Sequence, residues 1–201
     1  QSTIVNGVCD GGPFVVHGRA DGLIIENNYV HEDIGKAVPN CWGISLNHGG
    51  VPNEGFDRLI IRGNRVFNVG NSGIGCQGCT NTIIENNIVV HEQNYGIAAI
   101  KVPQKPDDID LTDFATDNVT IRNNVVYINN QESNLGINVG PFPRGGDDFV
   151  VVNNVIYYAG NNNFFRCFSF PESASRYDAI DNNLCFTPNA PNAEWEDSSG
   201  S

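Results

Sequence analysis

The sequence has 201 residues, of which 40% are hydrophobic and 17% are charged, and its net charge is −12. This length predicts one domain, and the acidic balance disfavours nucleic acid as a partner because binding to phosphates requires a basic surface. No apolar run approaches the roughly 18 residues that a membrane-spanning helix needs. Asn, Gly and Val are abundant whereas Ala, Leu and Lys are scarce, which disfavours a helical protein. We therefore expect a folded β-protein without a membrane span.

The cysteines indicate an oxidising compartment. The chain contains six Cys and no Met, and its first residue is Gln. A processed, secreted or cell-surface protein explains this pattern, and a domain cut from a longer protein explains the missing Met equally well. Pairing each cysteine with its nearest neighbour in the sequence predicts three disulfides, Cys9–Cys41, Cys76–Cys79 and Cys167–Cys185.

One phrase recurs along the chain: a β-rich run, a turn of two residues that usually reads Asn-Asn, and a second apolar run. Its copies lie at 23–30, 59–66, 82–89, 119–126, 150–156 and 179–185. The second Asn of the turn is present in all copies, at Asn28, Asn64, Asn87, Asn124, Asn154 and Asn183. Each copy alternates with period two, and the length between copies varies, so this is not a helical repeat. The pattern predicts stacked β-strands with connections of variable length.

A second phrase, Gly-Ile followed by small or polar residues, lies between these copies. It occurs at 43–46, 73–76, 96–99 and 136–139, with a degenerate copy at 164–167.

Together, the two phrases resemble the right-handed parallel β-helix of the pectate-lyase-like (pectin lyase-like) superfamily. The resemblance covers residues 3 to about 186. It implies a single-stranded all-β solenoid of about six to seven rungs with three strands each, in which the second Asn of each pair forms a stacked ladder. It also makes the Gly-Ile phrase the first strand of each rung. We accordingly expect a parallel β-helix over residues 1–186 and a polar C-terminal tail over 187–201.

The alternation also predicts which side chains face the core. The inward positions before the Asn turn are Leu23/Ile25, Leu59/Ile61, Thr82/Ile84, Val119/Ile121 and Phe149/Val151. The outward position just before the turn holds charges of alternating sign, at Glu26, Arg62, Glu85 and Arg122. Because rungs stack about 4.8 Å apart, these charges are expected to pair as a structural ladder on the surface.

The resemblance implies that a substrate lies on the outer face of the first strand. The alternation gives one outward row of Val15, Ser45, Gly75, Ala98, Asn138 and Arg166, and a second of His17, Asn47, Gln77, Ile100, Gly140 and Phe168. Small residues flanked by hydrogen-bonding groups suit a polysaccharide that lies across the rungs, and a plain solvated strand face is the alternative. The candidate substrate-binding residues are His17, Asn47, His48, Gln77, Asn138 and Arg144.

Cleavage of an acidic polysaccharide by a lyase needs a cation beside the uronate carboxylate and a base. Lys101 or Arg166 is the candidate base, and Asp107 and Asp108 are candidates to hold Ca²⁺. Asp110 from the same acidic loop is a further candidate ligand, since Ca²⁺ prefers oxygen ligands.

A glycoside hydrolase needs two carboxylates instead. Asp107 or Asp108 with Asp147 or Asp148 would form that pair. No catalytic signature of the family occurs in the sequence, so it leaves open whether the protein cleaves or only binds a polysaccharide.

A different function follows from the apolar side chains outside the core. The outward positions of the strand before the Asn turn include Ile24, Ile60, Ile83 and Val150, and we expect a terminal segment, another domain or a second copy to cover this stripe. A second outward row, three residues after each ladder Asn, reads His31, Phe67, Val90, Tyr127, Tyr157 and Phe186. The alternative to a glycan-directed protein is therefore a non-catalytic structural or filament-forming protein that assembles through this stripe or by end-to-end stacking.

Overall fold

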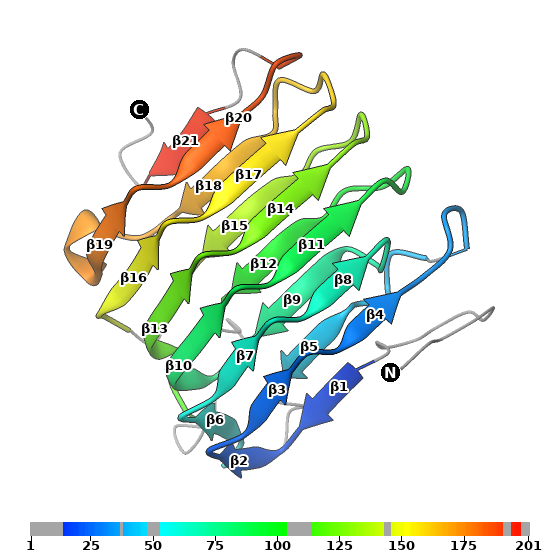
Figure 1. Ribbon diagram of the computed structural model, residues 1–201. Coiled ribbons are helices and arrows are strands. Elements are labelled where there is room, and N and C mark those ends of the chain that lie inside the picture. The colour runs from blue at the N-terminus through cyan, green and yellow to red at the C-terminus, as the bar shows by residue number, and fades with distance from the viewer. Residues whose placement is uncertain are drawn as a thin grey trace.

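The computed structural model describes residues 14–36, 38–47, 53–103, 114–142, 146–190 and 194–197. The strands among these residues pair in parallel, and the same residues contain one 3-10 helix, η1 (Ala174–Arg176), and no α-helix. Within the same ranges, no helix is long and apolar enough to cross a membrane. The strands enter three sheets in turn, and strands from successive passages lie side by side (Figure 1). One passage through the three sheets is called a rung below.

The three sheets are named in the order in which the chain enters them. Sheet 1 contains β1 (Phe14–His17), β5 (Ile44–Asn47), β9 (Ser72–Cys76), β12 (Ala98–Val102), β15 (Leu135–Val139), β18 (Arg166–Phe170) and β21 (Glu194–Asp197). Sheet 2 contains β2 (Arg19–Asp21), β3 (Ile24–Glu26), β6 (Gly55–Asp57), β7 (Ile60–Arg62), β10 (Cys79–Glu85), β13 (Asp117–Arg122), β16 (Phe149–Val152) and β19 (Tyr177–Asp181). Sheet 3 contains β4 (Tyr29–His31), β8 (Arg65–Phe67), β11 (Ile88–His91), β14 (Val125–Ile128), β17 (Val155–Tyr158) and β20 (Leu184–Phe186).

The two-residue turn from sheet 2 to sheet 3 explains the recurring Asn pair. Its first residue has left-handed backbone geometry, with φ of 55° at Asn86 and 56° at Asn123. Asn tolerates this geometry better than most residues, and Gly, which has no Cβ, tolerates it best. Gly63, with φ of 63°, therefore replaces the first Asn in one rung without changing the turn.

The second residue of the turn forms the predicted ladder. The side-chain amide of Asn87 donates to Oδ1 of Asn124 at 3.0 Å, and Asn124 donates in the same way to Asn154 at 3.0 Å. Equivalent bonds link all six ladder residues, from Asn28 to Asn183. Because the central members are fully buried, a broken bond would leave polar groups unsatisfied in the core, at about 1–3 kcal/mol each.

The predicted inward positions before the turn lie in the core. Leu59, Ile61 and Ile84 are fully buried, and Leu23 packs against the core from a partly buried position. Thr82 is the polar exception, and its Oγ1 donates to the carbonyl oxygen of Thr80 at 3.1 Å. The register of this strand was thus predicted correctly.

The charged row pairs as expected. Arg62 lies 2.7 Å from Glu26, and Arg122 lies 2.7 Å from Glu85. Nearly half of each arginine side chain is exposed to solvent, so each pair contributes about 1 kcal/mol or less. Their role is to remove like-charge repulsion between neighbouring strands.

The predicted register was wrong at two copies of the Gly-Ile phrase. Ile100, and not Ile97, aligns with Ile74 and Ile137. Likewise Phe168, and not Phe165, aligns with Ile137. Both strands begin later than predicted, because a period-two pattern of apolar residues gives no unique starting point where several apolar residues follow each other.

These shifts change the predicted outward rows. Ala98 and Arg166 do not align with Asn138; both pair with Leu135. Ile100 and Phe168, predicted to face outward, are fully buried. Lys101 takes the place in the row that was assigned to Ala98.

The cysteine pattern and the C-terminal segment add two findings. Cys76–Cys79 and Cys167–Cys185 are disulfide-bonded as predicted. Cys41 is also disulfide-bonded, and its predicted partner Cys9 lies outside the described residues. Within the predicted tail, β21 pairs in parallel with β18, so parallel structure extends beyond Phe186.

Candidate functional site

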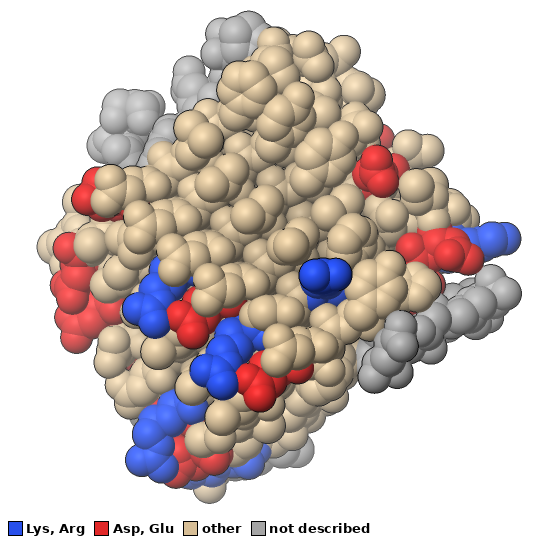
Figure 2. Space-filling view, viewed as in Figure 1, with Lys and Arg blue, Asp and Glu red and all other residues tan. Residues whose placement is uncertain are grey.

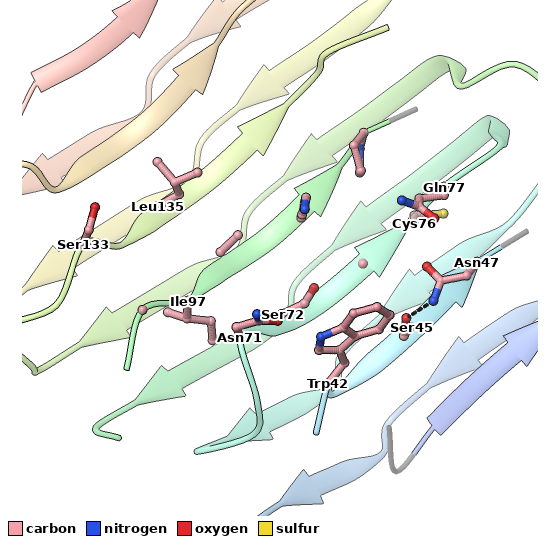
Figure 3. A pocket seen from close by; sticks show the side chains of 15 residues that line it. Trp42, Ser45, Asn47, Asn71, Ser72, Cys76, Gln77, Ile97, Ser133 and Leu135 are labelled. Carbon is pink, nitrogen blue, oxygen red and sulfur yellow. Dashed lines mark hydrogen bonds between the residues drawn. The ribbon is translucent and has the colours of Figure 1, made fainter. Parts of the chain in front are cut away.

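The outer face of sheet 1 contains a cavity of about 450 Å³. Its floor is formed by β5, β9 and β12, and Leu135 of β15 closes one side (Figure 3). This is the face on which the sequence predicted a substrate site.

The centre of the floor is a row of small side chains that ends in one long cation. Ser45 aligns with Gly75, and Gly75 aligns with Lys101. Ser45 is 2% exposed, and Gly75 has no side chain to fill the space above it. A Cβ at position 75 would lie 3.0 Å from Oγ of Ser72, so the glycine keeps the floor low.

The wall of the cavity comes from the connections between sheet 3 and sheet 1. These connections contribute Trp42, Asn71, Gly96 and Ser133. The Trp42 ring lies beside Ser45 and Asn47, which are joined by a 2.8 Å hydrogen bond from Nδ2 of Asn47 to Oγ of Ser45 (Figure 3). Nε1 of Trp42 is buried and has no hydrogen-bond partner among the described residues.

The electrostatics of the cavity are simple. Lys101 is the one charged residue among the described residues that line it, and the other polar groups are hydroxyls and amides. Its side chain is exposed and forms no ion pair with another described residue. The cavity therefore offers a single positive charge beside neutral hydrogen-bonding groups.

Several predicted binding residues come together here. His17 aligns with Asn47 across neighbouring strands. Gln77 follows Cys76, the partner of Leu46, and therefore lies next to Asn47. Asn47 and Gln77 line the cavity, and Asn138 is beside Lys101 in the next strand, largely buried.

The two candidate bases are in different rows. Arg166 aligns with Leu135, whereas Lys101 aligns with Asn138. Arg166 is half-buried, and its guanidinium donates to the carbonyl oxygen of Phe165 at 3.4 Å. Lys101 lines the cavity and Arg166 does not.

The candidate carboxylates do not meet at this cavity. Asp147 is exposed and lies 3.5 Å from Arg176, and neither Asp147 nor Asp148 lines the cavity. The other residues of the predicted lyase, hydrolase, calcium and binding sets lie outside the described residues: Asp107, Asp108, Asp110, His48 and Arg144. Among the described residues, no group of three or more His, Cys, Asp or Glu side chains could hold a metal ion.

Sequence reasoning missed the wall residues, above all Trp42. The signal was available, because Trp42 immediately precedes the first Gly-Ile phrase. Alternation within a strand does not place a side chain that belongs to the connection before the strand, so the period-two pattern gives no position for Trp42.

A buried polar network lies under the same connections. Nε2 of His91 donates to the carbonyl oxygen of Tyr95 at 2.9 Å, and Nδ1 of His91 has no hydrogen-bond partner in the described part of the chain. Burial lowers the pKa of His91, partly offset by that hydrogen bond, and burial raises the pKa of Tyr95. Glu32 is 5% exposed, and burial raises its pKa as well. Tyr95 directly precedes Gly96 of the cavity lining, and its hydroxyl donates to the carbonyl oxygen of Val69 at 3.0 Å.

No protein-family model matches the sequence, and no curated protein matches it. The function must therefore be argued from the fold and the cavity.

Proposed function

We propose that the chain is a right-handed parallel β-helix of the pectate-lyase-like kind and that it binds an acidic polysaccharide in the sheet 1 cavity. The three parallel sheets and the Asn ladder support the fold. The observation that carries the function is the combination of Trp42, neutral amides and hydroxyls, and Lys101 around one open cavity.

The chemistry of sugars matches these groups. A sugar ring has an apolar C–H face and a rim of hydroxyls, and an indole ring packs on the former while amides and hydroxyls bond the latter. The unpartnered Nε1 of Trp42 is a further donor, provided that the ring shifts on binding. Lys101 would pair with a carboxylate or sulfate on the sugar, because it has no ion pair with a described residue.

Binding is better supported than cleavage. Hydrolysis needs two carboxylates about the scissile bond, and none lines the described part of the cavity. A lyase step needs a base near the sugar, and Lys101 is the candidate that lines the cavity. We therefore propose binding as the function and treat cleavage as an outcome of the same experiment.

We also propose that the protein acts outside the cell or at its surface. The two disulfides support this location, because disulfides persist in oxidising compartments.

Calorimetric titration with a panel of acidic and neutral glycans tests the proposal. The unaltered protein should bind an acidic glycan, Trp42→Ala should weaken binding at least tenfold, and Lys101→Gln should weaken binding of acidic glycans alone. Lys36→Gln and Phe164→Ala, exposed positions outside the cavity, are the matched controls and should bind normally. Release of unsaturated sugars with and without Ca²⁺ would show cleavage. If no glycan binds, or if Trp42→Ala binds as the unaltered protein does, the proposal is wrong.

A further inference from the structure

A second surface lies on the outer face of sheet 3 and, unlike the cavity, is exposed, apolar and uncharged. It consists of two adjoining columns that run along the stack and is called the sheet 3 face. The aliphatic column is Ile88, Val125, Val155 and Leu184, and each member is aligned with the next. The aromatic column is Val90, Tyr127, Tyr157 and Phe186, aligned in the same way.

The sheet 3 face is exposed although it is apolar. Val125 is 43% exposed, Leu184 is 55% exposed and Phe186 is 50% exposed. Figure 2 shows acidic and basic side chains at the lower left and at the left and right edges of the view, and a broad uncharged area between them over β14 and β17. Arg65 aligns with Ile88 at the N-terminal end of the aliphatic column, so the uncharged surface begins at Ile88. A continuous surface of this kind marks an interface.

A sugar is a poor occupant for this face. The rings of Tyr127 and Tyr157 stack on each other, with centroids 5.6 Å apart and planes 19° apart. Phe186 follows, with its centroid 5.2 Å from that of Tyr157. Stacking covers the ring faces that would pack against a sugar, and it leaves ring edges outward. A highly charged partner is equally disfavoured, because the face has no charge to pair with it.

The sheet 3 face is complementary in shape to itself. A column of tall aromatic side chains lies beside a column of short aliphatic ones, with the same rung spacing. A two-fold axis parallel to the stack exchanges the columns, so that the aromatic column of each copy fits the aliphatic column of the other. We propose that the sheet 3 face binds a second copy of this chain in this arrangement.

The size of the face sets the expected strength. Six members of the two columns are between 37% and 55% exposed. A large apolar side chain has a surface of roughly 150–250 Å², so these six present roughly 80 Å² each and roughly 500 Å² per copy in total. Two copies then bury roughly 1,000 Å², which is the lower limit for a specific interface. We therefore expect a dimer that dissociates in the micromolar range or weaker.

Sedimentation velocity with the full chain, from micromolar to millimolar concentration, tests the dimer. The unaltered protein should convert from monomer to dimer as the concentration rises. Val155→Glu should raise the dissociation constant at least tenfold, because it places a charge at the centre of the face. Ile34→Glu, at an apolar position that is 62% exposed but outside the face, should dimerise normally. A monomer at every concentration, or a Val155→Glu variant that dimerises as tightly as the unaltered protein, would overturn the proposal.

Cross-linking tests the arrangement and does not depend on glycan binding. A mixture of the single variants Val155→Cys and Tyr157→Cys should form mixed disulfide dimers, because the two columns face each other across the axis. Each variant alone should cross-link much less. Efficient cross-linking of Val155→Cys with itself would show that like columns face each other, which contradicts the proposed axis. Circular dichroism and thermal unfolding of each variant exclude misfolding as the cause.

Discussion

The outer faces of sheets 1 and 3 are built on the same rungs, yet one contains a cavity with hydrogen-bonding groups and a lysine, and the other is an open apolar surface. On sheet 1, Ser45 is 2% exposed beneath a wall that includes Trp42. On sheet 3, Val125 is 43% exposed.

The connections explain this difference. The turn that enters sheet 3 has two residues in every rung, because each ladder Asn fixes its geometry, and such a turn cannot rise above the sheet. The connection that enters sheet 1 varies, from Phe67 to Ser72 in one rung and from His31 to Ile44 in another. Those longer connections provide Trp42, Asn71 and Ser133. The short turn that enters sheet 3 contributes no side chains above that sheet. The longer connections that enter sheet 1 contribute the side chains that line the cavity.

The largest effect, on the free energy of unfolding, is expected for a substitution in the Asn ladder. Asn124 donates to Asn154 and to the carbonyl oxygen of Ile84, and it accepts from Asn87. Asn124→Ala leaves these buried groups unsatisfied, so it should lower the free energy of unfolding by about 3 kcal/mol. Denaturant unfolding measures the loss. Asn123→Gly is the matched control, because Gly accepts the left-handed backbone at this position, and it should change stability by less than about 1 kcal/mol. Equal stability of the two variants would show that the ladder is not a main source of stability.

The ladder and the core before it could be predicted because their signal is local. A two-residue turn with a left-handed first residue and a buried Asn requires the same short phrase in each rung, and alternation then fixes the inward side chains. The cavity could be predicted only in part. The row of His17, Asn47 and Gln77 follows from alternation within well-marked strands.

The remaining part of the site depends on contacts between rungs. The segment from Ile97 to Val102 is almost continuously apolar, so two registers fit the pattern. A hydrogen bond from the backbone of Ile97 to Oδ1 of Asn134 belongs to the connection entering sheet 1 and delays the start of β12. That shift brings Lys101 into line with Gly75 and Asn138. No pattern within one repeat contains this information.

A smaller effect separates the two faces from each other. Trp42→Ala should reduce glycan binding at least tenfold, by about 1.4 kcal/mol or more, and should leave dimerisation unchanged. Val155→Glu should give the reverse result. Titration and sedimentation of both variants test this independence. If Trp42→Ala also abolished the dimer, or Val155→Glu also abolished glycan binding, the two surfaces would be coupled through a shared conformational change.

The smallest effect concerns two buried ionisable residues, His91 and Glu32, and it depends on pH. His91 has a pKa below its unfolded value of about 6.5, mainly because it is buried. The unfolded chain therefore binds a proton that the folded chain does not. The contribution of His91 to stability is complete above about pH 6.5 and declines as the pH falls below it, until the lowered folded pKa is passed.

Glu32 should act in the opposite direction. Its pKa is raised, mainly by burial, so the folded chain retains a proton that the unfolded chain loses. Stability from this group is complete below about pH 4.5 and is lost as the pH rises through the raised folded pKa. Glu32→Gln should therefore stabilise the protein at neutral pH.

Denaturant unfolding at a series of pH values separates these two contributions. The stability difference between the unaltered protein and His91→Gln should be constant above about pH 6.5 and should shift against the unaltered protein below it. A difference that does not vary with pH would mean that His91 titrates equally in the folded and unfolded chains. The Nδ1 atom of His91 would then have access to water in the folded chain.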